Sequence, residues 1–202
     1  MTRLDTISKY ITNDEKVLDV GCDQALLSKL LAKRGIYSVA SDLRSNIIDN
    51  AKKSVPENLK PYIDFRVGNG VTLGENEEGY TLVLAGMGTY TILDILKNTN
   101  KQFNKIITIS NNNNNILRKE MLNIGYKINL EEIIKERNKY YNLILFEKGT
   151  SIYNIEDIYI GINHQNKELL KEYLNYLIDK YSKISENKEL IKIVETLKNY
   201  NY

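Results

Sequence analysis

Short apolar runs alternate with amphipathic stretches along the first 125 residues of the chain. Runs that end at polar residues or glycine predict β-strands, and stretches whose apolar residues recur every three or four positions predict helices. The expected strands are Val17–Val20, Tyr37–Ser41, Ile63–Val67, Thr81–Ala85 and Lys105–Ile109. The expected helices are residues 1 to about 15, Gln24–Arg34, Ser45–Ser54, a helix ending at Leu96, and Ile116–Asn123. This alternation predicts an α/β fold with a mostly parallel sheet and helices on both faces.

The pattern changes in the last third of the chain. Tyr126–Ile134 and Tyr141–Glu147 predict a final antiparallel pair of strands. After Gly149, apolar residues recur at helical spacing, first at Leu170, Tyr173, Leu177, Tyr181 and Ile184, and then at Leu190, Val194 and Leu197. We therefore predict a domain over residues 1–150 and two antiparallel helices with a coiled-coil-like seam over residues 151–202. A seam closed within one chain favours a monomer, although the pattern alone also allows a dimer.

Composition narrows the class of protein. A hydrophobic content of 42% in 202 residues is typical of a globular chain with one core. The net charge of +2 predicts no strong nucleic-acid footprint, although a local basic face is compatible with it. The sequence has no apolar run long enough for a bilayer span and no signal-peptide pattern, so we expect a cytoplasmic protein without a membrane partner.

The turn after the first expected strand carries candidate chemistry. Asp19 and Gly21 end this strand, Asp23 precedes the helix, and the second strand is followed by Asp42. A carboxylate about 20 residues after the glycine turn can accept hydrogen bonds from a ribose diol. The single glycine disfavours NAD, whose pyrophosphate needs close backbone approach at several glycines, and suits S-adenosylmethionine instead. An ordinary strand-to-helix turn is the alternative.

Two further glycine-rich segments follow later strands. Asn69 lies between Gly68 and Gly70, and its amide oxygen can accept a hydrogen bond from an adenine amino group. In the segment Ala85–Gly88, two glycines allow a ligand close to the backbone, and the methionine between them offers a polarizable surface to a flat ring. For each segment, a tight turn without a ligand is the alternative.

Three other features carry less weight. The run Asn111–Asn115 is best explained as a compositional insertion, although one or two members lie beside the expected substrate mouth. Cys22 is the single cysteine, so no internal disulfide forms, and we interpret it as a packing residue. His164 is the single histidine, and we expect it at the surface or at a helix start. No metal site is expected.

Taken together, these segments resemble the bacterial tRNA (adenine-N1) methyltransferases of the TrmK type, which modify adenine 22. The matching segments are Arg3-Leu4, Asp19–Leu27, Gly68–Gly70, Ala85–Thr89, Leu117-Arg118, the strands from Glu132 to Tyr141, and the tail from Tyr159. The chain departs from the family pattern at Gln24, where the family has His, at Asn69, where it has Asp, and at Ser110-Asn111, where it has Gln-Pro. The altered loop affects the expected substrate contacts more than the cofactor pocket.

The resemblance implies a Rossmann-like class I sheet that binds S-adenosylmethionine and transfers its methyl group to N1 of adenine in tRNA. The cofactor residues it implies are Asp19, Gly21, Cys22, Gln24, Asp42, Leu43, Gly68, Asn69, Gly70, Ala85, Gly86 and Met87. The substrate residues it implies are Arg3, Gly88, Asn112, Arg118 and Tyr141. Asp23 is the candidate catalytic residue for stabilising the cationic product ring, and it could equally hold the methionine amino group or cap the helix.

The tail has two interpretations within this resemblance. Its lysines could hold the tRNA backbone or simply solvate the helices; they are Lys167, Lys171, Lys180, Lys183 and Lys188. Two other functions stay open: a methyltransferase for a small molecule or a protein, and a non-catalytic RNA-binding module with a decayed cofactor site. The second is motivated by Gln24 and Asn69.

Overall fold

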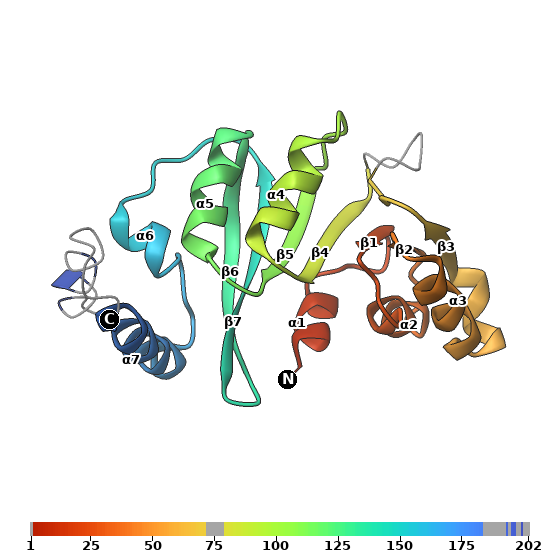
Figure 1. Ribbon diagram of the computed structural model, residues 1–202, viewed down its shortest axis with the longest axis horizontal. Coiled ribbons are helices and arrows are strands. Elements are labelled where there is room, and N and C mark those ends of the chain that lie inside the picture. The colour runs from red at the N-terminus through yellow and green to blue at the C-terminus, as the bar shows by residue number, and fades with distance from the viewer. Residues whose placement is uncertain (1, 72–78, 184–192, 194, 197–198, 200–202) are drawn as a thin grey trace.

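The computed structural model describes residues 2–71, 79–183, 193, 195, 196 and 199. In these residues, seven strands form one sheet in the order β3-β2-β1-β4-β5-β7-β6 (Figure 1). The strands are β1 Val17–Val20, β2 Ser38–Asp42, β3 Ile63–Val67, β4 Thr81–Met87, β5 Lys105–Ser110, β6 Tyr126–Glu136 and β7 Lys139–Lys148. Strands β1 to β5 pair in parallel, whereas β7 runs antiparallel to both β5 and β6. This arrangement confirms the predicted Rossmann-like α/β class.

Helices connect the strands in the predicted order. They are α1 Arg3–Lys9, α2 Leu26–Ala32, α3 Ser45–Ser54, α4 Thr89–Lys97, α5 Asn114–Asn123, α6 Ile155–Tyr159 and α7 Lys167–Ser182, with a 3-10 helix η1 at Glu57–Tyr62. Neither η1 nor α6 follows from the hydrophobic pattern, because both are too short to show a period. Among the described residues, no helix combines the length and apolarity needed to cross a bilayer.

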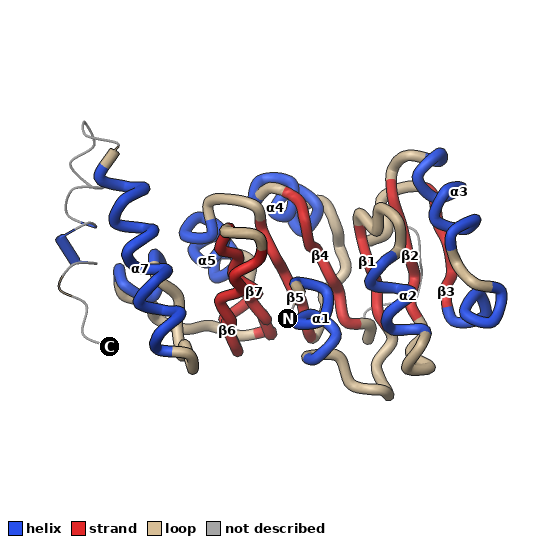
Figure 2. The backbone as a smooth tube through the Cα atoms, turned by 90° about the horizontal axis from the view of Figure 1, so that it is seen from below, coloured by secondary structure: helices blue, strands red, loops and turns tan. Residues whose placement is uncertain are grey.

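The central strands bury both faces, which explains why their sequences are mostly apolar. Leu18 and Leu82 point into a core with α4 and α5, whereas Val17 and Val83 pack with α1 and α2 on the other face. Figure 2 shows the strands edge-on, with α4 and α5 on one side and α1 and α2 on the other. The helices therefore fix the sheet from both sides and leave the carboxyl ends of β1, β2 and β4 available to a ligand.

The C-terminal helix α7 lies beyond the β6 edge of the sheet (Figure 2). Its apolar stripe, at Leu170, Tyr173, Leu174 and Leu177, packs in one cluster with Ile133 of β6. This stripe confirms the helical spacing predicted for the first segment of the tail. The predicted second helix, with Leu190, Val194, Leu197 and Lys188, lies outside the described residues, so the seam stays a prediction.

A buried ion pair joins the C-terminal segment to the sheet. Arg118 of α5 donates from Nε to Oε1 of Glu131 in β6 at 2.8 Å, and both side chains are fully buried. The same guanidinium donates to the carbonyl of Ile158 at 2.8 Å, and the Ile162 N–H donates to Glu131 at 2.8 Å. Gly161 passes so close that a Cβ there would lie 1.8 Å from Glu131 Oε2. The buried ion pair and its hydrogen bonds therefore attach the chain around and after α6 to the sheet, in addition to the apolar packing of α7.

Candidate active site

A cavity of about 880 Å³ opens at the carboxyl ends of β1, β2 and β4, and α1 and the β6–β7 hairpin also line it. Ligands of doubly wound folds bind at this edge of the sheet. The cavity gathers most residues that the sequence indicates, namely Arg3, Asp19, Gly21, Cys22, Asp23, Gln24, Asp42, Ala85, Gly86, Met87 and Tyr141. Segments from the two ends of the predicted domain thus meet at one site.

The turn after β1 is tightly wound. Gly21, Asp23 and Ala25 all have left-handed backbone conformations, with φ of 78°, 47° and 51°. The N–H groups of Gly21 and Cys22 both donate to the carbonyl of Ser41 at 2.9 Å, which fastens the turn to β2. A Cβ at Gly21 would approach Cε of Met87 to 3.0 Å. Glycine is therefore required by the conformation and by the neighbouring side chain, and it keeps the cavity floor open.

Two carboxylates on the floor have different environments. Asp19 is buried, and this burial raises its pKa to about 7, against the effect of a 3.3 Å hydrogen bond from Ser28 Oγ. Burial alone would also raise the pKa of Asp42, but hydrogen bonds from Arg44 outweigh it and hold that pKa below its usual value. Arg44 donates to Oδ1 of Asp42 from its backbone N–H and from Nε, both at 3.0 Å. A ribose diol at Asp42 would have to share or replace these donors.

The glycine segment that was expected to follow the fourth strand lies mostly within the end of β4, which continues to Met87 and contains a β-bulge between Ala85 and Met87. Gly86 is left-handed there, with a φ of 82°, and its carbonyl accepts a 2.7 Å hydrogen bond from Nδ2 of Asn111. The neighbouring Asn112 accepts at Oδ1 from the N–H of Thr89 at 3.2 Å. The asparagine loop therefore supports the turn and the start of α4, a role that its composition alone did not indicate.

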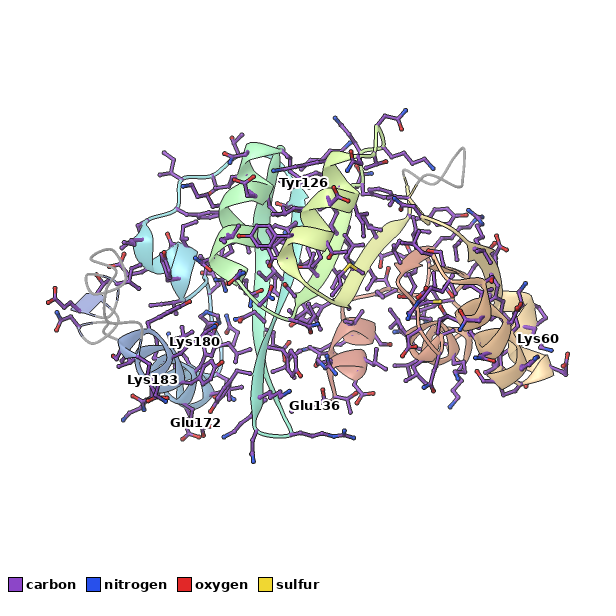
Figure 3. The ribbon with its side chains drawn as sticks, viewed as in Figure 1. Lys60, Tyr126, Glu136, Glu172, Lys180 and Lys183 are labelled. Carbon is purple, nitrogen blue, oxygen red and sulfur yellow. The ribbon has the colours of Figure 1, made fainter. Side chains whose placement is uncertain are left out.

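The opposite wall comes from α1 and the β6–β7 hairpin. The Arg3 guanidinium lies over the Tyr141 ring at 4.3 Å from its centroid, and Nε of Arg3 donates to Glu136 at 2.6 Å. Figure 3 labels Glu136 near the lower end of the hairpin, beside α1. The sequence predicted Arg3 and Tyr141 as site residues, and the structure adds the contact between them.

Several lining residues were missed by the sequence analysis. Thr2, Arg44, Glu136, Arg137 and Lys139 all line the cavity. For the residues of the hairpin, the sequence offered one signal. A short polar turn separates the two predicted antiparallel strands, and such a turn is typical of a hairpin. Nothing in the sequence indicates that this hairpin reaches the N-terminal helix.

Some predicted residues lie outside the lining of the cavity. Leu43 follows Asp42 and is 75% exposed, and Gly88 and Asn112 lie behind the bulge. Asn69 accepts at Oδ1 from the N–H of Val71 at 3.3 Å. Gly70 is buried where a Cβ would lie 2.1 Å from Ser41 Oγ. The roles of Leu43 and Gly68–Gly70 in cofactor binding stay predictions.

The predicted substrate contact at Arg118 is wrong. Its side chain is fully buried against Glu131, so no RNA can reach the guanidinium in this structure. Burial alone would lower the pKa of Arg118, but the charge of Glu131 outweighs that effect and keeps the pKa above its usual value. This arginine therefore acts as a structural cation.

The other isolated residues are also structural. Burial, with the nearby Asp19 and Asp42, raises the pKa of Cys22 to about 12, which agrees with a packing residue and not with a thiolate nucleophile. His164 is 7% exposed and hydrogen-bonded to the Ile160 carbonyl, so the expected surface position is wrong. In the part of the chain that the structure describes, no three His, Cys, Asp or Glu side chains could hold a metal ion.

Comparison with solved structures supports the fold over nearly the whole chain. The structure of M. capricolum TrmK in complex with S-adenosyl-homocysteine is 25% identical and has a TM-score of 0.83, covering 99% of this chain and 96% of that one. A Streptococcus pneumoniae protein in complex with S-adenosyl-L-methionine is also 25% identical, with a TM-score of 0.86 and coverage of 97% and 96%.

Sequence comparison covers shorter segments. A tRNA (adenine(22)-N(1))-methyltransferase of Bacillus subtilis (strain 168) is 28% identical over 155 residues, which are 73% of this chain and 64% of that enzyme. A magnesium-protoporphyrin O-methyltransferase of Rhodobacter capsulatus is 31% identical over 80 residues, 40% of this chain and 36% of that enzyme. The chain thus matches less than two thirds of the length of either relative. Residues 1–144 match the model of the methyltransferase domain, and the chain belongs to this family.

Proposed function

We propose that the chain is an S-adenosylmethionine-dependent methyltransferase that acts on N1 of adenine 22 in tRNA. One observation carries this proposal: the motif residues of β1, β2 and β4 share a single cavity with Arg3 and Tyr141. A volume of about 880 Å³ lies near the top of the range of roughly 300–1,000 Å³ for ligand pockets. Such a cavity offers room for a cofactor and for a base beside it.

The residues on the floor suit this cofactor. Asp42 ends β2 with a carboxylate that could accept hydrogen bonds from a diol if the diol shared or replaced the donors of Arg44. A Cβ at Gly86 would meet no atom within 4 Å, so the backbone is open to a ligand there. When bound, S-adenosylmethionine supplies an electrophilic methyl group on a sulfonium that is a good leaving group. Asp23 and the ionised form of Asp19 line the cavity and would offer negative charge to the cofactor's cationic groups. Two similar proteins support this cofactor here: the M. capricolum protein binds the cofactor product S-adenosyl-homocysteine, and the Streptococcus pneumoniae protein binds S-adenosyl-L-methionine.

Methyl transfer to N1 needs little acid–base chemistry from the protein, because N1 already carries a lone pair. The chain has to align N1 with the methyl group and exclude water. The base has to leave its stack, which costs a few kcal/mol. The methylated ring is cationic, and Asp23 lines the cavity where its carboxylate can stabilise that charge. Holding the methionine amino group remains the alternative role for Asp23.

The partner in this proposal is tRNA, acting with a monomeric, cytoplasmic enzyme. The match to the M. capricolum protein extends over 99% of the chain, including the C-terminal helix. Lys167, Lys171 and Lys180 of α7 are exposed and available to a nucleic acid, and Lys183 pairs with Asp179 at 2.7 Å. Figure 3 labels Lys180 and Lys183 on this helix.

Mass spectrometry of tRNA nucleosides tests the proposal. Wild-type protein incubated with S-adenosylmethionine and unmodified tRNA should yield 1-methyladenosine, and Asp19→Ala should abolish the product. Sequencing by reverse-transcription stops should locate the modification at position 22. A folded protein that binds the cofactor but methylates no RNA would instead favour a small-molecule substrate, a possibility motivated by the similarity to the Rhodobacter capsulatus enzyme.

A further inference from the structure

The tip of the β6–β7 hairpin brings two cations to the rim of the cavity. Arg137 and Lys139 are exposed, and both line the same cavity as Asp19 and Asp42. They stand more than 90 residues beyond Asp42 in the chain, so only the fold brings them to this site. Neither belongs to the motifs that indicate cofactor binding.

The charges around the tip are paired, except for these two. Glu136 accepts from Arg3 at 2.6 Å, and Lys135 pairs with Glu172 of α7. Among the described residues, no carboxylate lies within 4.0 Å of the charged groups of Arg137 or Lys139. The rim therefore carries uncompensated positive charge above a floor with three aspartates.

The tip is also held in a defined position. In the register of the hairpin, Glu136 at the end of β6 lies opposite Lys139 at the start of β7. The two turn residues between them, Arg137 and Asn138, are left-handed, with φ of 49° and 62°. Two left-handed central residues are typical of the tight hairpin turn that matches strand twist, where Asn, Asp and Gly are preferred. Arginine at the first position is unfavourable for the backbone, and such residues cluster at functional sites.

We propose that Arg137 and Lys139 bind the backbone phosphates that flank the adenosine entering the cavity. This inference rests on the proposed function. A base inside the cavity leaves its own phosphates at the mouth, where the two cations lie. The planar guanidinium of Arg137 can donate two parallel hydrogen bonds to one phosphate, and the Lys139 ammonium supplies a point charge. The acidic floor and the basic rim then serve different parts of the reaction.

The test uses the full chain with Arg137→Asn and Lys139→Gln combined. Asparagine accepts the left-handed conformation, so the turn should form and the melting temperature should stay constant or rise. The matched control is Lys52→Gln with Lys53→Gln, two exposed lysines of α3 that do not line the cavity. We expect the KM for tRNA to rise about tenfold or more in the rim variant and by less than about twofold in the control.

The salt dependence of tRNA affinity provides a second test, because it would stay unchanged if Arg137 and Lys139 had only a structural role. Losing two phosphate contacts should reduce the slope of log affinity for tRNA against log salt by about 1 to 2, measured by fluorescence anisotropy with labelled tRNA. Affinity for S-adenosylmethionine, measured by calorimetry, should stay within about twofold of the wild type in both variants, because the cations are assigned to RNA alone.

The outcomes separate this inference from the proposed function. If tRNA binding and its salt slope match the control variant, the phosphate assignment is overturned while 1-methyladenosine formation stands. If cofactor affinity falls instead, the rim holds the cofactor's carboxylate, and the assignment is equally overturned. Absence of 1-methyladenosine with wild-type protein counts against the proposed function, whereas the anisotropy slopes still test the phosphate contacts.

Discussion

The parallel half of the sheet and its antiparallel edge achieve order by different means. In β1, β2 and β4, apolar side chains fill both faces, and the cofactor floor is built from backbone turns at the strand ends. At β6 and β7, apolar residues also enter both cores, but charged and aromatic side chains add contacts to the neighbouring helices, such as Arg118 with Glu131 and Arg3 with Tyr141. A site can thus combine a floor made of turns with a wall made of side chains.

This difference predicts different responses to mutation. Changes on the parallel half should alter cofactor affinity, because its carboxylates and glycines face the floor. Changes at the antiparallel edge should alter stability or RNA binding and leave cofactor affinity intact. The following predictions test that separation, from the largest expected effect to the smallest.

Replacement of Glu131 by Leu should have the largest effect. It leaves Arg118 as a buried, unpaired cation and removes the acceptor of the Ile162 N–H, so the free energy of unfolding should fall by about 3–5 kcal/mol. Urea denaturation measures this change. The control is Glu132→Leu, whose carboxylate forms a partly exposed pair with Lys9 and should contribute less than about 1 kcal/mol. Equal losses in the two variants would refute the role of the buried pair.

Replacement of Asp42 by Ala tests the parallel half. Loss of both carboxylate oxygens at the end of β2 should weaken S-adenosylmethionine binding about 10- to 100-fold, since a hydrogen bond to a charged group contributes about 1.5–3 kcal/mol. Isothermal titration calorimetry measures the affinity. Asp64→Ala on the neighbouring strand β3, outside the cavity lining, is the control and should bind normally. Unchanged affinity for Asp42→Ala would remove the ribose contact from the site.

Replacement of Arg3 by Ala tests the antiparallel wall. The guanidinium loses its stacking on Tyr141 and its pair with Glu136, interactions that together contribute about 1 kcal/mol. We expect kcat/KM for tRNA to fall about three- to tenfold, which corresponds to about 1 kcal/mol, with unchanged cofactor affinity. Steady-state methylation kinetics measure it. Arg3→Lys should recover only part of the activity, because an ammonium does not stack as a flat guanidinium does. Weakened cofactor binding would contradict the separation of the two regions.

The last prediction, similar in size to the effect of Arg3→Ala, is a pH dependence from Asp19. Its pKa of about 7 means that this carboxyl is largely neutral at pH 6 and ionised at pH 8. Cofactor affinity should therefore rise up to about tenfold from pH 6 to pH 8, because the ionised form attracts a cationic ligand. Asp19→Asn should flatten the profile, and Asp42→Asn should preserve its slope.

Stability without cofactor should follow the opposite trend. A carboxyl whose pKa is raised by folding binds its proton more tightly in the folded state than in the unfolded state. Its contribution to the free energy of unfolding is therefore largest below the unfolded pKa of 3.8 and is lost as the pH rises through about 7. A comparison of wild type with Asp19→Asn by denaturation at several pH values isolates this contribution. A rise in the wild-type-minus-variant difference between pH 5 and pH 8 would contradict it.

The sequence was most informative where function depends on local turns. Gly21 with its neighbouring acids, and Gly86, could be identified because strand, glycine and helix follow one another within a few residues. The position of Arg118 was predicted incorrectly because its partner, Glu131, lies on a different element and no periodicity links the two. Arg137 and Lys139 were missed for the same reason, since their approach to the cavity depends on sheet order. Local chemistry was therefore predictable, whereas long-range pairing of charged side chains was not.

The contact between Arg3 and Glu136 spans 133 positions in the chain. At about 5–20 residues per second, a ribosome needs roughly 7 to 27 seconds to synthesise that interval. The strands that form the floor are complete at Met87, so a nascent chain can assemble the acidic floor well before the hairpin emerges. The basic rim is necessarily the last part of the cavity to form. Under the proposed function, the molecule would therefore gain the elements for its cofactor before those for its RNA substrate.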